Sequence, residues 1–358
     1  MIESPGRWER MVSENADATE DPVAGRRSAR GLTMATVART LGLSHQTVSR
    51  VLNDHPSVRP ETRARVLRAI EDLGYRRNPA ARSLVTRRSQ TLGVVSFDTT
   101  LYGPASTVFA IERAAREAGY FVSVVSLKEI DEGAIREAID RLAIQSVDGI
   151  VVLAPLRSTA AALSAVDPQL PAVILEGGSV PELASVSVDQ MEGARLATRH
   201  LLERGATTVR HVAGPPDWIE AEHRVDGWRD ELQRSGAAVH KPVRGDWSPS
   251  SGYQAGRRLA RQRGLEAVFV ANDQMALGLL RAFSETGIRV PQDVLVAGFD
   301  DIPEAAYFTP PLTTVRQDFA AVGRRSIELL LEQVESGRSA RRQSVVAPQL
   351  IVRQSTSR

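Results

Sequence analysis

The chain of 358 residues contains no cysteine, which excludes disulfide bonds, thiolate metal sites and cysteine nucleophiles. Long apolar runs are also missing: segments such as AVFVA and LGVVSF are far shorter than the roughly 20 residues that a membrane-spanning helix needs. The N-terminus has no apolar signal core. We therefore expect a cytoplasmic protein of two or three domains with no membrane partner.

The sequence also lacks the motifs of several common enzyme classes. It contains no G-x-x-x-x-G-K-[ST] loop, no H-E-x-x-H and no G-x-S-x-G. The group Glu220, Glu222 and His223 is typical of a helix surface rather than of a metal site. Asp300 and Asp301 are adjacent at a predicted strand end, where neighbouring side chains usually point in different directions. We expect no catalytic activity, no metal and no cofactor.

The net charge is only +2, but it is unevenly distributed along the chain. Residues 1–25 contain two arginines and six acidic residues, for a net charge of −4. Residues 26–88 contain fourteen arginines and four acidic residues, for +10, whereas residues 89–358 contain 29 basic and 33 acidic residues, for −4. A basic segment of this kind suits a surface that neutralises phosphates, and an arginine-rich solvated face is the alternative.

The basic segment contains the pattern of a helix-turn-helix. Residues 1–31 are polar and are expected to be a disordered leader. From Thr33 the apolar spacing predicts a helix whose inward residues are Met34, Val37, Ala38 and Leu41. Gly42 ends this helix, and Ser44 is placed to cap a second one. A short second helix after a tight glycine turn fits the major groove of DNA.

The second helix begins with side chains suited to base edges. Gln46 has amide geometry that suits adenine, Arg50 has a fork that suits guanine or phosphate, and His45 can donate or accept. For any one of these side chains, solvation at a helix surface is the alternative. The DNA contacts predicted within the helix-turn-helix domain, residues 32–77, are Thr33, Ser44, His45, Gln46, Ser49, Arg50 and Asn53.

A third helix and a short hinge follow. The third helix is predicted from about Pro60 to Leu73, ending at Gly74, with a buried stripe of Val66, Leu67, Ile70 and Leu73. The hinge helix and linker cover residues 78–89. So short a helix is not stable alone, and we predict that it becomes ordered when it pairs with its twin on DNA. Its predicted DNA contacts are Asn78, Ala81 and Leu84, with Leu84 as a minor-groove wedge, and an ordinary linker is the alternative.

Residues 90–358 alternate short apolar runs with helical patterns. The runs are LGVVSF, FVSVVSL, GIVVLA, AVILE, VRHVAG, AVFVA and VLVAGF. The helical segments lie near 105–118, 133–145, 190–205, 220–235, 249–263, 273–287 and 318–336. Continuous apolar strands between helices indicate parallel sheets covered on both faces, here two doubly wound α/β subdomains. We place the first at about 90–188 and 318–346, and the second at about 189–317 and 347–358.

Polar and aromatic residues gather at the predicted strand ends, where such sheets bind ligands. They are Phe97, Asp98, Leu101, Tyr102, Gly103, Pro104, Glu176, Trp218, Arg224, Trp247, Asn272, Asp273, Asp300 and Asp301. Carboxylate, amide and guanidinium groups can hold neighbouring hydroxyls, and a tryptophan face covers the C–H side of a sugar ring. We therefore predict a sugar pocket with Trp247 in its wall, whereas Trp228, in the middle of a helix, is predicted to be core.

The segment Leu32–Thr86 resembles the DNA-binding headpiece and hinge of the lactose/galactose repressor (LacI/GalR) family of bacterial transcription regulators. The resemblance continues to about residue 355 through GDWSPSSGYQ, VANDQMALG, AGFDD and PPLTTVRQDF. It implies a core like that of type I periplasmic binding proteins. It implies that His45, Gln46 and Arg50 read operator bases while Leu84 intercalates. It also implies effector contacts from Arg224, Trp247, Asn272, Asp300 and Gln317, with Glu176 and Phe319 beside them.

This sequence departs from the family pattern at several positions. Met34-Ala35-Thr36 lacks the acidic residue that is common after the opening threonine, and Arg59 stands where a small capping residue is frequent. In the predicted pocket, Glu176 replaces a shorter aspartate, Phe97 a small hydroxyl residue, and Val188 an aromatic one. The resemblance therefore supports a sugar rather than any particular sugar, with a galactoside as one candidate.

The pattern as a whole predicts a homodimeric repressor that a sugar inducer releases from a palindromic operator of double-stranded DNA. A dimer is expected because the chain ends at LIVRQSTSR without a leucine heptad tail. One alternative is a regulator of the same family that uses a non-sugar corepressor such as a purine. The other is a sugar-binding receptor protein, which would need an export signal and no headpiece.

Overall fold

The computed structural model describes residues 32–75, 88–97, 100–127, 131–159, 167, 169–176, 183–338 and 342–357. The chain divides into two compact units, Met1–Arg82 and Ser83–Arg358. The predicted leader, residues 1–31, lies outside the described residues, as do Asn78, Ala81 and Leu84 of the predicted hinge and Asp98. No described helix is both long and apolar enough to span a membrane.

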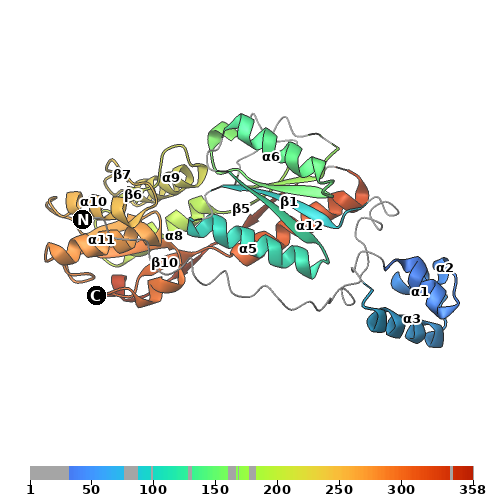
Figure 1. The fold of residues 1–358 in the computed structure, drawn as a ribbon. Helices are drawn as coiled ribbons and strands as arrows, with labels where there is room; N and C mark the ends of the chain where they lie inside the picture. Colours follow the sequence, from blue (N-terminus) through green and yellow to red (C-terminus); the bar gives the residue numbers. More distant parts are fainter. Residues whose placement is uncertain are drawn as a thin grey trace, which may run out of the picture. The chain divides into compact units, whose positions relative to one another are not determined.

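The described part of the first unit, here called the headpiece, is formed by the helices α1 (Met34–Leu41), α2 (His45–Leu52) and α3 (Pro60–Leu73) (Figure 1). They enclose one small core, formed by Val37, Ala38, Val48, Val51, Val66 and Tyr75. The prediction that Leu67 is buried is wrong, because this side chain is 50% exposed. Ala69 is buried in its place, so α3 presents a narrower face to α1 and α2 than its apolar pattern indicates.

Capping residues fix both ends of α1 and the start of α2. Thr33 Oγ1 accepts from the Thr36 N–H at 3.3 Å, and the Thr33 N–H donates back to Thr36 Oγ1 at 3.4 Å. Thr36 thus closes the capping box in which an acidic residue is usual. Gly42 ends α1 in the left-handed conformation at φ 64°, and Ser44 Oγ caps α2 by accepting from the Thr47 N–H at 3.1 Å. Arg59 precedes α3 without a side-chain cap.

The second unit contains two sheets, and the predicted doubly wound α/β fold is confirmed. The described strands of the first sheet, in spatial order, are β11 (Gln343–Val346), β5 (Ala184–Val188), β4 (Ala172–Leu175), β3 (Gly149–Leu153), β1 (Thr91–Phe97) and β2 (Phe121–Leu127). Those of the second are β12 (Gln349–Ile351), β10 (Thr313–Arg316), β9 (Leu295–Asp300), β8 (Ala267–Val270), β6 (Arg210–Ala213) and β7 (Val243–Arg244). Among the described strand pairs, β10 and β12 run antiparallel and the others run parallel.

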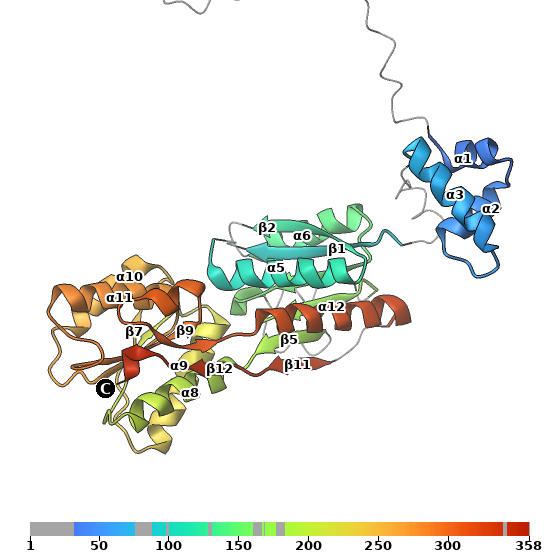
Figure 2. The ribbon, with the colours of Figure 1, turned by 90° about the horizontal axis from the view of Figure 1, so that it is seen from below.

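Helices cover both faces of each sheet (Figures 1 and 2). Around the first sheet these are α5 (Tyr102–Glu117) and α12 (Phe319–Ser336) on one face and α6 (Glu132–Ile144) on the other. Around the second they are α8 (Gln190–Glu203) and α9 (Ile219–Arg234) on one face and α10 (Pro249–Leu259) and α11 (Asp273–Glu285) on the other. Burial on both faces explains why the strands are continuous apolar runs.

The chain passes between the two sheets three times: after β5, after β10, and between β11 and β12. We call the part built on the first sheet the N-lobe and the part built on the second sheet the C-lobe. Short 3₁₀ helices complete the described elements: Arg157–Thr159, Pro303–Tyr307 and Gln354–Thr356. The parallel strands of both lobes have their carboxyl ends at the crossings, which brings the strand-end residues of one lobe opposite those of the other.

Candidate functional site

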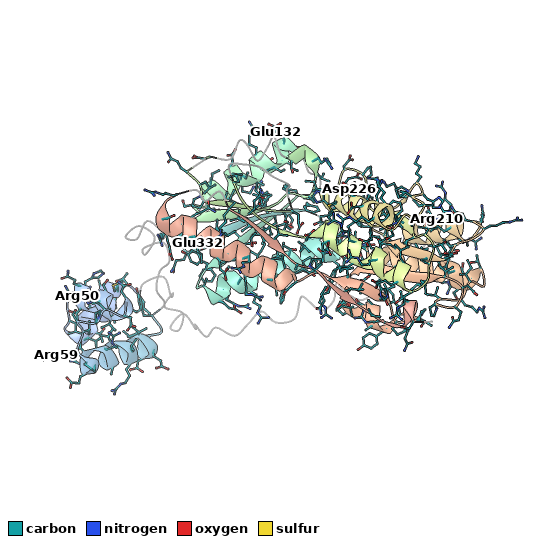
Figure 3. All side chains as sticks on the ribbon, turned by 180° about the vertical axis from the view of Figure 1, so that it is seen from behind. Arg50, Arg59, Glu132, Arg210, Asp226 and Glu332 are labelled. Carbon is teal, nitrogen blue, oxygen red and sulfur yellow. The ribbon has the colours of Figure 1, made fainter. Side chains whose placement is uncertain are left out.

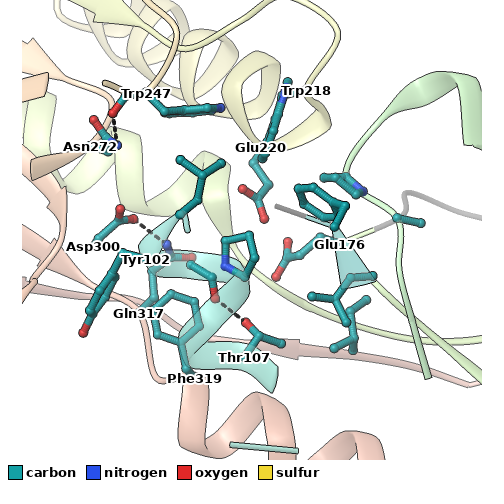
Figure 4. A pocket seen from close by; sticks show the side chains of 18 of the residues that line it. Tyr102, Thr107, Glu176, Trp218, Glu220, Trp247, Asn272, Asp300, Gln317 and Phe319 are labelled. Atoms are coloured by element: carbon teal, nitrogen blue, oxygen red, sulfur yellow. Dashed lines mark hydrogen bonds between the residues drawn. The ribbon is translucent and has the colours of Figure 1, made fainter. Parts of the chain in front are cut away.

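One pocket lies between the lobes, and all the residues predicted to contact the effector line it (Figure 4). These residues are Phe97, Leu101, Gly103, Pro104, Glu176, Arg224, Trp247, Asn272, Asp300, Gln317 and Phe319. The pocket encloses about 620 Å³, including its opening to solvent. Its other lining residues are Tyr102, Thr107, Leu153, Ala154, Pro155, Leu175, Trp218, Glu220 and Gln274.

A chain of hydrogen bonds fixes the polar wall of the pocket. Arg224 on α9 donates from Nε to Gln190 Oε1 at 2.8 Å and from Nη1 to the carbonyl of Ala271 at 2.6 Å. Gln190 Nε2 donates to Gln317 Oε1, and Gln317 Nε2 donates to Asp300 Oδ1, both at 2.8 Å. Residues from five separate segments are thereby held in one arrangement, which is the preorganisation that a polar ligand needs.

The Arg224 guanidinium is itself nearly inaccessible. Its side chain is 3% exposed, and its Cζ lies 3.9 Å from the ring centroid of Phe299, so the planar group stacks on that ring. Nη1 lies 3.9 Å from Asp300 Oδ1, near enough to favour the carboxylate. Burial nevertheless raises the pKa of Asp300 to about 6, against the opposing influence of Arg224 and the hydrogen bond from Gln317.

The raised pKa predicts that an Asp300→Asn variant becomes more stable relative to the wild type as the pH rises. The Asp300 pKa is about 6 in the folded state, against an ordinary value of 3.8, so ionising the buried carboxyl costs nothing below pH 3.8, costs more as the pH rises from 3.8 to 6, and costs the full amount above about pH 6. The advantage of the variant in free energy of unfolding should therefore grow by about 1 kcal/mol from pH 5 to pH 7. Urea unfolding of both proteins at both pH values measures it, and a difference that is independent of pH contradicts the assignment.

Aromatic side chains form a second wall. Trp218 meets Phe97 edge to face with ring centroids 5.3 Å apart, and it meets Trp247 similarly at 5.4 Å. Tyr102 and Phe319 form a further edge-to-face pair at 5.9 Å. Trp247 is 5% exposed, and its Nε1 has no hydrogen-bond partner among the described residues. A buried indole N–H usually has an acceptor, so this atom is available to a ligand in the pocket.

Three lining residues adopt left-handed backbone conformations that favour glycine. They are Glu176 at φ 58°, Trp247 at φ 74° and Asp300 at φ 106°. Such conformations are costly for residues with a Cβ and cluster at functional sites. The Trp247 indole also needs Gly214 beneath it, since a Cβ there would lie 2.3 Å from the ring carbon Cη2. The positions of these side chains are therefore maintained at a cost to stability.

The interpretation of Glu220 as a helix-surface residue is wrong. Trp218 precedes α9 and Glu220 lies in its first turn, which the fold places at the pocket, so both residues line it. Glu222 and His223 do lie outside it: Glu222 pairs with Arg244 at 2.7 Å, and His223 is exposed. No group of three potential metal ligands occurs within the described residues.

Two of the strand-end carboxylates do not reach the pocket. Asp273 is fully buried and accepts from Thr314 Oγ1 at 2.6 Å and from the Ile302 N–H at 3.0 Å, so it braces the loop after β9. Asp301 turns away from Asp300, as expected for adjacent residues, and pairs with Arg316 and Arg353. Trp228 is fully buried and donates from Nε1 to the Val209 carbonyl at 3.0 Å, which confirms it as core.

Asn272 has a structural duty besides facing the pocket. Its Oδ1 caps α11 by accepting from the Met275 N–H at 2.9 Å, and its Nδ2 donates to the Trp247 carbonyl at 3.1 Å. The residues Tyr102, Gly103 and Pro104, predicted to lead into a helix, form the first turn of α5 instead. A proline is tolerated there because the first-turn N–H groups have no partner within the helix.

In the headpiece, His45, Gln46 and Arg50 are exposed on α2 (Figure 3 labels Arg50). The Arg50 side chain has no hydrogen-bond or ion-pair partner among the described residues. The other predicted DNA contacts have local roles as well. Thr33 and Ser44 are the helix caps described above, Ser49 is half-buried, and Asn53 ends α2 with an exposed side chain. Exposed polar side chains at the start of a short helix are suited to a groove of DNA.

Comparison with known proteins gives matches to both units. A model of the bacterial regulatory proteins of the lacI family matches residues 33–78, and a model of a periplasmic binding protein-like domain matches residues 198–356. The chain is 33% identical to the lactose operon repressor of Escherichia coli strain K12 over 91% of each protein. It is 34% identical to the HTH-type transcriptional regulator CelR of Thermobifida fusca, over 90% of this chain and 98% of CelR. It is 31% identical to the HTH-type transcriptional repressor PurR of Vibrio parahaemolyticus, over 90% and 97% respectively.

Solved structures of a lac repressor and of CelR also match this chain. The crystal structure of the lac repressor dimer bound to operator and the anti-inducer ONPF has a TM-score of 0.83 and 33% identity, and the match covers 91% of this chain and 99% of that one. The structure of a CelR–cellobiose complex has a TM-score of 0.68 and 30% identity, with coverage of 90% and 99%.

Proposed function

Because the chain belongs to the lacI family of bacterial regulatory proteins, we propose that it represses transcription as a cytoplasmic homodimer and that a sugar bound between its lobes releases it from a palindromic operator. The observation that carries the sugar assignment is the pocket, in which Arg224, Asp300 and Gln317 face an aromatic wall with a free Trp247 N–H. Fixed donors and acceptors opposite aromatic faces suit a ring with hydroxyls on its edge and C–H groups on its face.

The headpiece supplies the DNA side of the proposal. His45, Gln46 and Arg50 project from a short helix that follows a tight turn, in a segment with fourteen arginines between residues 26 and 88. We propose that these three side chains read base edges, that Thr33, Ser44, Ser49 and Asn53 add contacts, and that Asn78, Ala81 and Leu84 engage the operator centre. Two-fold symmetry follows from a palindromic site that two copies of the helix occupy.

For release, the sugar must bind the form that is not on DNA more tightly than the DNA-bound form. The pocket can provide this difference because its lining comes from both lobes: Glu176 and Phe319 from the N-lobe, and Arg224, Trp247 and Asn272 from the C-lobe. A change in the separation of the lobes therefore changes how many contacts a bound sugar makes.

A purine corepressor is the second candidate, and the similarity to PurR favours it. Operator-binding assays with a palindrome from the DNA flanking the gene distinguish the two. We expect fluorescence anisotropy to show that sugars weaken operator binding and that hypoxanthine and guanine leave it unchanged. Operator binding strengthened by a purine and indifferent to sugars would replace the sugar proposal with the corepressor one. A receptor protein, the third class, would bind the sugar but no DNA.

A further inference from the structure

Two carboxyl groups face one side of the pocket, one from each lobe. Glu176 follows β4 of the N-lobe, and Glu220 lies in the first turn of α9 of the C-lobe. Figure 4 shows both carboxyls pointing into the cavity, with Trp218 beside Glu220. The Val188 N–H donates to Glu176 Oε1 at 3.0 Å, and Gln190 also forms a hydrogen bond with this carboxyl, so the side chain is fixed at the edge of the cavity.

A single cation of the described lining, Arg224, faces three carboxyl groups. Among the described residues that line the pocket, Arg224 is the only basic one, against the carboxyls of Glu176, Glu220 and Asp300. Arg224 pairs with Glu220 at 3.8 Å and with Asp300 at 3.9 Å, and its Nε and Nη1 also donate to Gln190 and Ala271. One positive charge is therefore shared among three carboxyl groups. Burial raises the pKa of both Glu176 and Glu220, that of Glu176 to about 8, and their proximity adds to the shift in Glu176.

A second, independent feature also points to a ligand at this side. Trp247 is 5% exposed and its Nε1 has no partner within the described part of the chain, although the atom is buried in the pocket wall. Its ring packs against Trp218, which Figure 4 shows next to Glu220. A set of carboxylates bordered by aromatic rings attracts an organic cation through both charge and ring quadrupole.

We propose that the effector carries a basic nitrogen, as in an amino sugar or an iminosugar, and that its ammonium group lies between Glu176 and Glu220. The ammonium donates to both carboxylates, while an adjacent hydroxyl oxygen accepts from Trp247 Nε1. This rests on the proposed function, since it refines which sugar-sized ligand the pocket takes. It also explains the long Glu176 side chain: with Glu220 it forms a carboxylate pair that a neutral sugar does not require.

Binding of an ammonium group should release a proton from the carboxyl pair. Without a ligand the Glu176–Glu220 pair holds a proton at pH 7, because burial and the neighbouring Glu220 raise the pKa of Glu176 to about 8. An ammonium group favours the carboxylate, so the proton leaves when the ligand binds. Affinity for an amine should therefore rise between pH 6 and pH 8, for as long as the ligand itself stays protonated. A neutral ligand gives no such rise.

Calorimetry on the full chain tests the inference with matched ligands. The probes are D-glucosamine, D-galactosamine and 1-deoxynojirimycin, with glucose, galactose and the N-acetyl derivatives as neutral counterparts. We expect at least one amine to bind at least about tenfold more tightly than its neutral counterpart. Repeating the titration in two buffers of different ionisation enthalpy should show the release of about one proton.

Carboxyl-to-amide variants test which residues cause the preference for an amine. Glu176→Gln and Glu220→Gln should each reduce the preference for the amine to a few-fold. Glu222→Gln is the matched control, since it removes a carboxyl two residues along α9 that pairs with Arg244 outside the pocket, and it should keep the preference.

Neutral sugars that bind as tightly as amines, or amine binding without proton release, overturn the inference and leave the sugar effector standing. If no sugar of either kind binds, both proposals fail, and the wild-type titrations alone decide this whether or not the variants fold.

Discussion

An Arg224→Ala variant should bind its operator with wild-type affinity and yet require at least about 100-fold more effector for release. Arg224 holds the hydrogen-bonded residues of the polar pocket wall in place. Its removal leaves Asp300 without a neighbouring cation, and Gln190 loses the donor at 2.8 Å that connects it to α9. The free energy of effector binding then falls both because a charged contact is lost and because the remaining polar groups lose their arrangement.

Fluorescence anisotropy of a labelled operator, titrated with effector, measures this result. Arg229→Ala is the matched control, because Arg229 lies on the same helix. Its side chain is 43% exposed, and its ion-pair partner within the described residues is Asp226. It should respond to effector as the wild type does. Normal release of the Arg224→Ala variant would remove Arg224 from the effector site, and a melting temperature far below that of wild type would show that its role is mainly structural.

An Arg50→Ala variant should lose roughly 5- to 150-fold in affinity for its specific operator, which corresponds to about 1–3 kcal/mol for one base contact. The headpiece should keep its fold, because Arg50 is exposed on α2 and the core beneath it is formed by Val48 and Val51. Effector affinity should not change, since Arg50 and the pocket belong to different units of the chain.

Two comparisons distinguish a base contact from a phosphate contact: Arg50→Ala against Arg68→Ala, and operator DNA against DNA of unrelated sequence. Arg68→Ala removes the same charge from an exposed position on α3 and should weaken binding to specific and unrelated DNA by similar, smaller factors. Arg50→Ala should instead reduce the ratio between specific and unrelated DNA. An equal loss on both kinds of DNA would make Arg50 a phosphate contact, and loss of helical circular dichroism would make it a structural residue.

Much of the fold could be predicted because the strands of both lobes are buried on two faces. Runs such as GIVVL in β3 and AVFV in β8 are fully buried, so they appear in the sequence as short continuous apolar segments between helical patterns. Strands that are short, lie at a sheet edge or contain polar residues are harder to recognise in the sequence. Serines interrupt β5, and β7 has two residues. The strands β11 (QSVV) and β12 (QLI) are short, lie at sheet edges and begin with polar residues. Their pairing depends on neighbours that are distant in sequence.

The candidate pocket was predictable to the extent that strand ends mark it. Trp247 and Asn272 follow strands or loops directly, whereas Glu220 lies inside a helix whose sequence, IEAEHR, resembles a solvated face. Only the three-dimensional structure shows that the first turn of α9 forms part of the pocket wall. In the same way, local spacing cannot show that α3 leaves Leu67 exposed, because the width of its buried face depends on how α1 and α2 pack against it.

The central claim is that the pocket and the DNA-binding surface are energetically coupled, and reciprocal titration tests it most directly. Operator affinity is measured with and without saturating effector, and effector affinity is measured with and without saturating operator. Linkage requires the two ratios to be equal, and we expect each to lie between about 5 and 150, with tighter effector binding in the absence of DNA. Two ratios equal to one would contradict the account, since a ligand with the same affinity for both forms cannot release the protein from its operator.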